Sequence, residues 1–161
     1  VGVSIPLTTL NDIATTWDNT IEPTVTNYFG SIPDIDDTCT VELLILSIDG
    51  GGGIGGYFNP GLSSAREIIF MDSDDLSWRN TIISHEFAHL LHSARDPGEY
   101  LWIDEGAADM ASYLTFGLTN TLTGHANSWT ESSNLSVRWW NQRIGDYGAG
   151  FLMMLLSLIH I

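Results

Sequence analysis

The sequence predicts an α+β fold in which a small mixed sheet packs on a helix over residues 76–94. Two continuous apolar runs, VELLILSID at 41–49 and EIIFMD at 67–72, are typical of buried strands. The segments that follow the second run show helical spacing of apolar residues and are separated by glycine and proline. We therefore expect further helices at 104–116 and at the C-terminal end.

The first element is expected to be a helix over residues 8–22. Its apolar side chains recur every three to four positions, as they do on the buried face of a helix: Leu10, Ile13, Trp17 and Ile21. Pro23 follows directly and is expected to end this helix.

A glycine-rich segment, GGGIGG at 51–56, lies between the two predicted strands. It matches the G-x-G-x-x-G pattern of dinucleotide-binding loops, which requires a helix to begin immediately afterwards. Pro60 and Gly61 prevent such a helix, and a chain of net charge −15 is a poor host for phosphates. We therefore expect a flexible connection between two strands, placed where it can overhang a cleft.

The helix over 76–94 follows an acidic segment in which Asp74 or Asp75 can act as its N-cap. Pro97 and Gly98 end it.

The next helix, 104–116, stops at Gly117. Residues 118–138 are rich in Thr, Asn and Ser, and this composition predicts a loop. A last helix is expected to begin near Tyr147 and to bury the apolar run at 151–161.

The chain shows no internal repeat and no linker, so a single domain over 1–161 is expected. It begins at Val1 without an initiator methionine and stops inside an apolar run, which indicates a domain truncated or processed at both ends. That run at 151–161 is shorter than the roughly 20 residues that a membrane-spanning helix needs, so no membrane span is predicted.

The composition is acidic and contains no lysine, with 20 Asp and Glu against 5 Arg. Such a surface repels phosphate backbones and anionic lipids, which excludes nucleic acid and membrane surfaces as expected partners. Only 16% of residues are charged, and a polar surface of Ser, Thr and Asn is common in exported proteins. Acid-rich chains without lysine also occur in high-salt organisms. The single Cys39 excludes an internal disulfide and is expected to be buried at the start of a strand.

The segment HEFAH at 85–89 carries the clearest chemical pattern in the chain. On a helix, His85 and His89 project from one face and can hold the same ion with both imidazoles. Glu86 follows the first histidine and lies about 100° around the helix, on the side away from the apolar residues. Two histidines leave zinc underbound, because a catalytic zinc has three protein ligands and one open position.

Three later positions are candidates for the third ligand. One of them, position 95, would hold a histidine in the metzincin arrangement, but it is Arg95 in this chain. His92 lies on the same face, but a full turn beyond His89, so its ring should miss an ion held by the pair. Glu105 in WIDEGAADM opens the next helix after a Pro-Gly turn, which lets that helix fold back against the first. Asp109 lies four residues after Glu105 on the same face, where a carboxylate can accept the free N–H of a ligating imidazole.

This order of motifs resembles the gluzincin zinc metallopeptidases, the thermolysin-like group with a zincin-like fold. Several segments are more similar to the hyicolysin family of secreted bacterial and archaeal gluzincins: LNDIATTWDNTIEPTVTNYFGSIPDIDD, GGYFNP, EIIFMDSDD, HEFAH, WIDEGAADMASY and DYGAGFLMMLL. The similarity extends over nearly the whole chain, and HEFAH and WIDEG are its specific parts. Fifteen residues separate His89 from Glu105, fewer than in thermolysin, so details of the cleft are not transferred.

The resemblance implies a secreted zinc-dependent metalloendopeptidase that hydrolyses peptide bonds of proteins or peptides through a zinc-bound water. His85, His89 and Glu105 are the implied metal ligands, and Glu86 is the implied general base. Gluzincins stabilise the oxyanion with a tyrosine or histidine downstream of the glutamate ligand. Tyr147 in GDYGAG is the first candidate for this role, and His125 is the second.

Two alternatives to an endopeptidase stay open at this point. One is a zinc exopeptidase with a pocket for a free chain end, and the other is a non-enzymatic domain stabilised by metal. The acidic clusters DIDD at 34–37 and DSDD at 72–75 could bind calcium, which is a secondary cofactor prediction. Neither cluster matches an EF-hand loop. Turn and capping roles are the favoured interpretation of both clusters.

Overall fold

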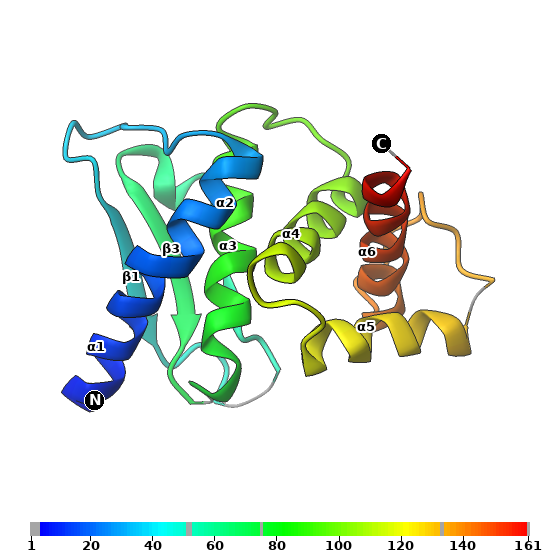
Figure 1. Cartoon of the computed structure of the whole chain (residues 1–161), viewed down its shortest axis with the longest axis horizontal. Coiled ribbons are helices and arrows are strands. Elements are labelled where there is room, and N and C mark those ends of the chain that lie inside the picture. The colour runs from blue at the N-terminus through cyan, green and yellow to red at the C-terminus, as the bar shows by residue number, and fades with distance from the viewer. Residues whose placement is uncertain (1–3, 51–52, 75, 133, 161) are drawn as a thin grey trace.

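The computed structural model describes residues 4–50, 53–74, 76–132 and 134–160. In this part of the chain, the sheet and helices α1 to α3 form one half of the molecule, and helices α4 to α6 form the other (Figure 1). The arrangement confirms the predicted α+β class and is compatible with a zincin-like fold. The site described below lies where the two halves meet.

The sheet has three strands in the order β1-β3-β2, with β3 (Glu67–Asp72) in the centre. β1 (Val41–Leu46) pairs with it in parallel, and β2 (Gly56–Tyr57) pairs with it antiparallel, which confirms a small mixed sheet. β2 is a short edge strand inside the segment that the sequence predicts as a flexible connection. Residues 51–52 of that segment lie outside the described part of the chain.

The N-terminal helix does not end at Pro23, and that prediction is wrong. α1 (Leu7–Thr16) continues through a π-helical turn (Trp17–Ile21) into α2 (Glu22–Phe29). The N–H of Glu22 donates to the carbonyl of Trp17, and Pro23 then falls in the first turn of α2. The π turn directly before Pro23 interrupts the i→i−4 hydrogen-bond pattern at the point where a proline cannot donate.

α3 (Arg79–Ser93) follows a 3₁₀ turn at Leu76–Trp78, close to the predicted boundaries. Asp74 does not cap it: its carboxylate accepts a hydrogen bond of 2.7 Å from the hydroxyl of Ser47, and Asp75 lies outside the described residues. The core is formed between α3, β3 and the N-terminal helices, with these side chains almost fully buried: Ile21, Val25, Ile69, Met71, Ile83, Phe87 and Leu91.

α5 (Asn120–Glu131) lies within the stretch 118–138 that the sequence predicts as a loop, and that prediction is wrong. Thr119 caps this helix by accepting a hydrogen bond from the N–H of Leu122, and the Leu122 side chain is fully buried. Packing against α6 therefore stabilises a helix that its own Thr, Asn and Ser residues disfavour.

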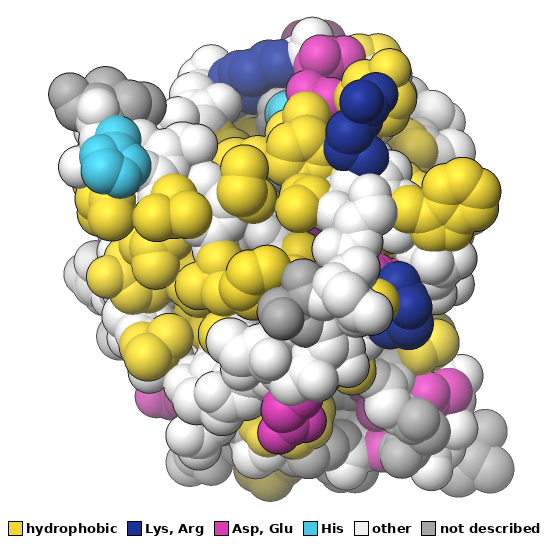
Figure 2. Space-filling view, turned by 90° about the vertical axis from the view of Figure 1, so that its right-hand side faces the viewer, with side chains coloured by type: hydrophobic (Ala, Val, Ile, Leu, Met, Phe, Trp, Pro, Cys, Tyr) yellow, Lys and Arg dark blue, Asp and Glu magenta, His cyan; other side chains and the backbone are white. Residues whose placement is uncertain are grey.

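α4 (Leu101–Phe116) begins three residues before the predicted start, and α6 (Ile144–Ile159) begins three residues before Tyr147. α6 is amphipathic, not wholly buried as expected. Phe151 is in the core, whereas other apolar side chains of α6 gather on the exposed face of this half (Figure 2): Met153, Leu156, Leu158 and Ile159. Among the described residues, no helix is long and apolar enough to cross a membrane.

Candidate metal centre

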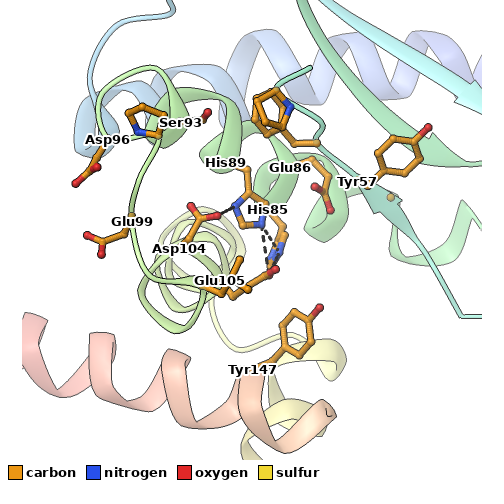
Figure 3. Close-up of a pocket in the computed structure, with 15 residues that line it drawn as sticks. Tyr57, His85, Glu86, His89, Ser93, Asp96, Glu99, Asp104, Glu105 and Tyr147 are labelled. Atoms are coloured by element: carbon orange, nitrogen blue, oxygen red, sulfur yellow. Dashed lines mark hydrogen bonds and ion pairs between the residues drawn. The ribbon is translucent and has the colours of Figure 1, made fainter. Parts of the chain in front are cut away.

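The three predicted ligands come together between α3 and α4 (Figure 3). Nε2 of His85 lies 3.1 Å from Nε2 of His89 and 3.1 Å from Oε2 of Glu105. Nε2 of His89 lies 3.4 Å from the same oxygen of Glu105. The two histidines are one helical turn apart on α3, and the Pro-Gly turn brings the N-terminal part of α4 back to face them.

This triangle of donor atoms fits a zinc ion. A tetrahedral zinc with bonds of about 2.0–2.1 Å separates its ligand atoms by about 3.3 Å. The three separations given above, from 3.1 to 3.4 Å, agree with that value. Two imidazole nitrogens and one carboxylate oxygen also form a donor set that zinc prefers in sites with an open fourth position.

Asp109 contacts His85, as its spacing from Glu105 predicts, through the ring nitrogen that does not face the donor triangle. Its Oδ1 lies 3.0 Å from Nδ1 of His85, and its Oδ2 lies 2.7 Å from Nδ1 of His125. The carboxylate is almost fully buried in α4. Burial raises the pKa of Asp109, but the contacts with His125 and His85 outweigh it and hold the pKa below its usual range. An ionised Asp109 orients His85 so that Nε2 faces the other donors.

Asp104 has the corresponding position beside the second histidine, and the sequence analysis missed it. Its Oδ2 lies 3.0 Å from Nδ1 of His89, and its Oδ1 lies 2.8 Å from Nδ1 of His92. His92 therefore pairs with Asp104 instead of facing solvent or the triangle. Asp104 directly precedes Glu105, and helical spacing places such neighbours on different faces, so the only usable signal was the acidic pair itself.

The electrostatics of the site follow from its burial and its excess of carboxylates. Burial lowers the pKa of His89, but the nearby Asp104 and Glu105 outweigh it and raise the pKa to about 9. Burial likewise lowers the pKa of His85, and Asp109 and Glu105 raise it well above its ordinary value. Burial raises the pKa of Glu105, yet both histidines hold it far below its ordinary value. A cationic species is thus favoured at the centre of the cluster.

Glu86 lies beside His85 and His89 but forms none of the pairs described above. Its side chain comes from α3 and lies on the side of the imidazoles away from Asp104 (Figure 3). Only 7% of the residue is exposed, and burial raises its pKa above the ordinary value of a glutamate. A buried carboxyl with a raised pKa is suited to accept and release a proton near neutral pH.

Tyr147, the first candidate for oxyanion stabilisation, faces the site from the first turn of α6. Its ring centroid lies 6.5 Å from that of His85 and 5.1 Å from that of His125, and the ring of Trp140 packs edge-on against it at 4.8 Å. Burial and the carboxylates of Glu105 and Glu86 raise its pKa, so the phenol keeps its proton at neutral pH. It can therefore act as a hydrogen-bond donor.

The site lies in a cleft that extends to both sides of it. A cavity of about 400 Å³ lies toward the end of α3 and the start of α4, and one of about 350 Å³ lies toward α5. Both are lined by Gly56, His85, Glu86 and Tyr147. The edge strand β2 forms one wall, and a Cβ at Gly56 would meet the Phe70 carbonyl at 2.6 Å.

The acidic clusters outside the cleft bond to nearby backbone and hydroxyl groups. Asp34 accepts from the N–H of Cys39 at 2.9 Å, and Asp72 accepts from the N–H of Ile48 at 2.9 Å. The turn around Asp34 exposes Cys39 just before β1, so the prediction of a buried cysteine is wrong. These contacts are those of turn residues.

The fold and the site together are compatible with the zincin-like class: an α+β structure in which a histidine pair on one helix faces a glutamate on the next. The chain is 28% identical, over an alignment of 175 residues, to the neutral metalloprotease ShpI of Staphylococcus hyicus. The alignment covers 88% of this chain and 40% of that protein, so the chain spans about two fifths of its relative's length. No protein-family model matches the chain. The similarity supports a metalloprotease family, and the cluster of His85, His89 and Glu105 is compatible with zinc binding.

Proposed function

We propose that the protein is a zinc-dependent metalloendopeptidase of the gluzincin type, with closest affinity to the hyicolysin family. The observation that carries the proposal is the triangle of His85, His89 and Glu105, whose donor separations match those around a tetrahedral zinc. The similarity to a neutral metalloprotease supports the reaction class. The gluzincin type rests on the glutamate ligand and its position one helix after the histidine pair.

In this proposal His85, His89 and Glu105 hold the metal. When bound, zinc supplies Lewis-acid polarisation of the scissile carbonyl and lowers the pKa of a water molecule. Asp109 accepts the Nδ1–H of His85, and the carboxylate of Asp104 lies 3.0 Å from Nδ1 of His89 as an ion-pair partner, which leaves each Nε2 free to bind. The ligands are therefore already oriented, and binding costs little rearrangement.

Glu86 and Tyr147 carry the proton transfer and the charge stabilisation. Glu86 accepts the proton of the attacking water and delivers it to the leaving amine, a role that its raised pKa suits. The hydroxyl of Tyr147 donates a hydrogen bond to the oxyanion that develops on the carbonyl oxygen. The packing of Trp140 against Tyr147 holds that ring beside the cleft.

The shape of the cleft favours cleavage inside a chain over removal of end residues. Its two cavities lie on either side of the shared residues Glu86 and Tyr147, so a peptide can extend in both directions from the reacting bond. The edge strand β2 offers unpaired backbone groups along which an extended peptide can lie. We further propose that the protein is exported, on the basis of its low fraction of charged residues and its surface rich in Ser, Thr and Asn.

Metal analysis and hydrolysis assays test this proposal together. The zinc-loaded chain should contain one zinc and cleave peptides whose two ends are chemically blocked, and 1,10-phenanthroline should abolish cleavage. Glu86→Gln should keep the zinc and lose turnover by about 10²–10⁴-fold. Cleavage restricted to peptides with a free end would favour an exopeptidase. Retained turnover in Glu86→Gln would refute the role given to this residue.

A further inference from the structure

A third cavity, of about 190 Å³, opens beside the cleft, and the proposed mechanism gives it no role. It shares Phe58, Pro60 and Ser93 with the larger cavity of the cleft, so the two are adjacent at the end of β2. Apolar side chains form most of its remaining wall: Pro33, Ile35, Leu90 and Ala94. A peptide lying along β2 therefore passes the mouth of this cavity.

Glu67, the first residue of β3, also lines this cavity, and its carboxylate is only half bonded. The residue is 1% exposed. One carboxylate oxygen, Oε1, accepts a hydrogen bond of 2.5 Å from the N–H of Ile35. The other, Oε2, is buried and has no hydrogen-bond partner among the described residues. A buried carboxylate oxygen without a partner is costly, and a cation is the partner that offsets the cost best.

The chain itself does not supply that cation in the described structure. It has no lysine and only five arginines. Arg66, next to Glu67 in sequence, pairs with Glu42 on the sheet surface. Arg95, next to the cavity wall, donates to the carbonyls of Leu91 and Ser31. Oε2 of Glu67 is therefore left without a cationic partner among the described residues, and Glu67 is part of the cavity wall.

We propose that this cavity binds the side chain of a lysine or arginine of the peptide substrate, with the ammonium or guanidinium group at Glu67. The inference rests on the proposed peptidase function and adds a substrate preference to it. The apolar walls suit the methylene stem of such a side chain, and the carboxylate suits its charged end. The enzyme would thus prefer substrates with a basic residue near the cleaved bond.

The chemistry of the cavity fits other small ligands less well. Calcium takes six to eight oxygen ligands, and here one carboxylate oxygen is free. The hydroxyls of Ser63 and Ser64 donate to the carbonyls of Ile68 and Gly61. An anion would be repelled by Glu67. A cation on an apolar stem is the ligand that can pack against the apolar walls and also pair with the carboxylate of Glu67.

A binding experiment tests the cavity without requiring hydrolysis. The zinc-loaded chain is titrated with n-butylguanidinium chloride and, separately, with the neutral n-butylurea, and binding is followed by NMR. Wild type should bind the cation more tightly than the urea, and Glu67→Gln should raise the Kd of the cation at least tenfold. Glutamine keeps an oxygen for the N–H of Ile35, so the loop stays attached. Equal binding of the cation by both proteins, or no preference for the cation in wild type, overturns the proposal.

A cleavage experiment tests the preference itself. End-blocked peptides that carry Lys, Arg or norleucine at each position around one bond are compared. The ratio of kcat/KM for the best basic peptide to that for its norleucine counterpart should fall at least tenfold in Glu67→Gln. Glu42→Gln, on the exposed surface of the neighbouring strand, should leave the ratio unchanged. A ratio near one in wild type, or an unchanged ratio in Glu67→Gln, contradicts the proposal.

A second variant covers the case in which Glu67→Gln does not fold. Ala94 is exposed and lines the cavity, so Ala94→Leu narrows it from outside without touching the core. It should weaken n-butylguanidinium binding at least fivefold, and unchanged binding counts against the proposal. If the chain cleaves none of the peptides, the proposed peptidase function fails, whereas the binding titration still decides whether the cavity takes a basic side chain.

Discussion

Gly106 of α4 and Gly150 of α6 bring the backbones of the two helices into direct contact. A Cβ at Gly106 would lie 2.7 Å from the carbonyl carbon and oxygen of Gly150. Gly106 directly follows Glu105, the proposed metal ligand, and Gly150 lies less than one turn after Tyr147. The close approach of the two helices therefore sets the distance between the candidate metal site and Tyr147.

Gly106→Ala should push α6 away from α4. The added methyl group meets backbone atoms, which cannot rotate aside, so we expect a loss of about 1–3 kcal/mol in the free energy of unfolding. Because Tyr147 moves with α6, kcat should fall more than zinc affinity does. Chemical denaturation and a zinc-competition assay measure the two effects.

Gly124→Ala is the matched control for that variant. Gly124 also lies inside a helix, α5, but a Cβ there meets nothing within 4 Å. The alanine should stabilise the protein by about 0.5–1 kcal/mol through its better helix propensity. Equal stability of the two variants would contradict the role given to the contact between Gly106 and Gly150.

The sequence predicts those parts of the fold that depend on local patterns. The strand at 67–72 is mostly apolar, the helix at 76–94 has one apolar face, and turn residues bound both. Both are found within a few residues of their expected limits. α5 was missed because its stability comes from packing on α6, a contact between distant segments. β2 was missed because two residues in a glycine-rich segment form a strand only when they pair with β3.

The candidate site also has a part that local sequence patterns predict and a part that depends on how distant segments pack. Helical spacing alone places His85 beside His89 and Asp109 on the face of Glu105, and the structure brings these residues together. The role of Asp104 depends on the angle at which α4 crosses α3, and no periodicity encodes that angle. The free carboxylate oxygen of Glu67 is likewise visible only in three dimensions, because the strand EIIFMD has the same pattern whether Glu67 is exposed or buried.

Asp109→Asn should weaken zinc binding. An amide has no charge and only one acceptor, whereas Asp109 contacts both His85 and His125. The loss of such an orienting carboxylate costs about 10–100-fold in metal affinity. Competition against a chromogenic chelator measures the change, and Glu131→Gln at the exposed end of α5 is the control. An affinity equal to that of the wild type would show that Asp109 does not support the ligand.

The metal-free protein should lose stability as the pH rises from about 6.5 to 9. The pKa of His89 is about 9 in the folded chain and about 6.5 in an unfolded one, so the folded state binds the proton more tightly. The resulting stabilisation is fully present below pH 6.5 and is lost as the pH passes 9; its size is on the order of 1–3 kcal/mol. Thermal denaturation in the presence of EDTA measures it.

Zinc should change that pH profile, because the metal competes with protons for the same nitrogens. Zinc affinity is therefore expected to rise from about pH 6.5 to 9, the range in which the metal-free protein loses stability. Zinc binding at pH 7.5 should release protons. Calorimetry in buffers of different ionisation enthalpy counts the protons released. His89→Ala should flatten the profile of the metal-free protein. A metal-free protein that is more stable at pH 9 than at pH 6.5 would contradict the prediction.

Tyr147→Phe should reduce kcat by about 10²–10³-fold, the usual cost of removing one oxyanion donor. The substitution removes only the hydroxyl, so the ring keeps its contact with Trp140, and zinc content and KM should change little. His125 is the competing donor, and His125→Gln separates the two assignments. Because His125 contacts Asp109, its loss should act mainly through zinc affinity. A larger fall of kcat at saturating zinc in His125→Gln than in Tyr147→Phe would transfer the donor role to His125.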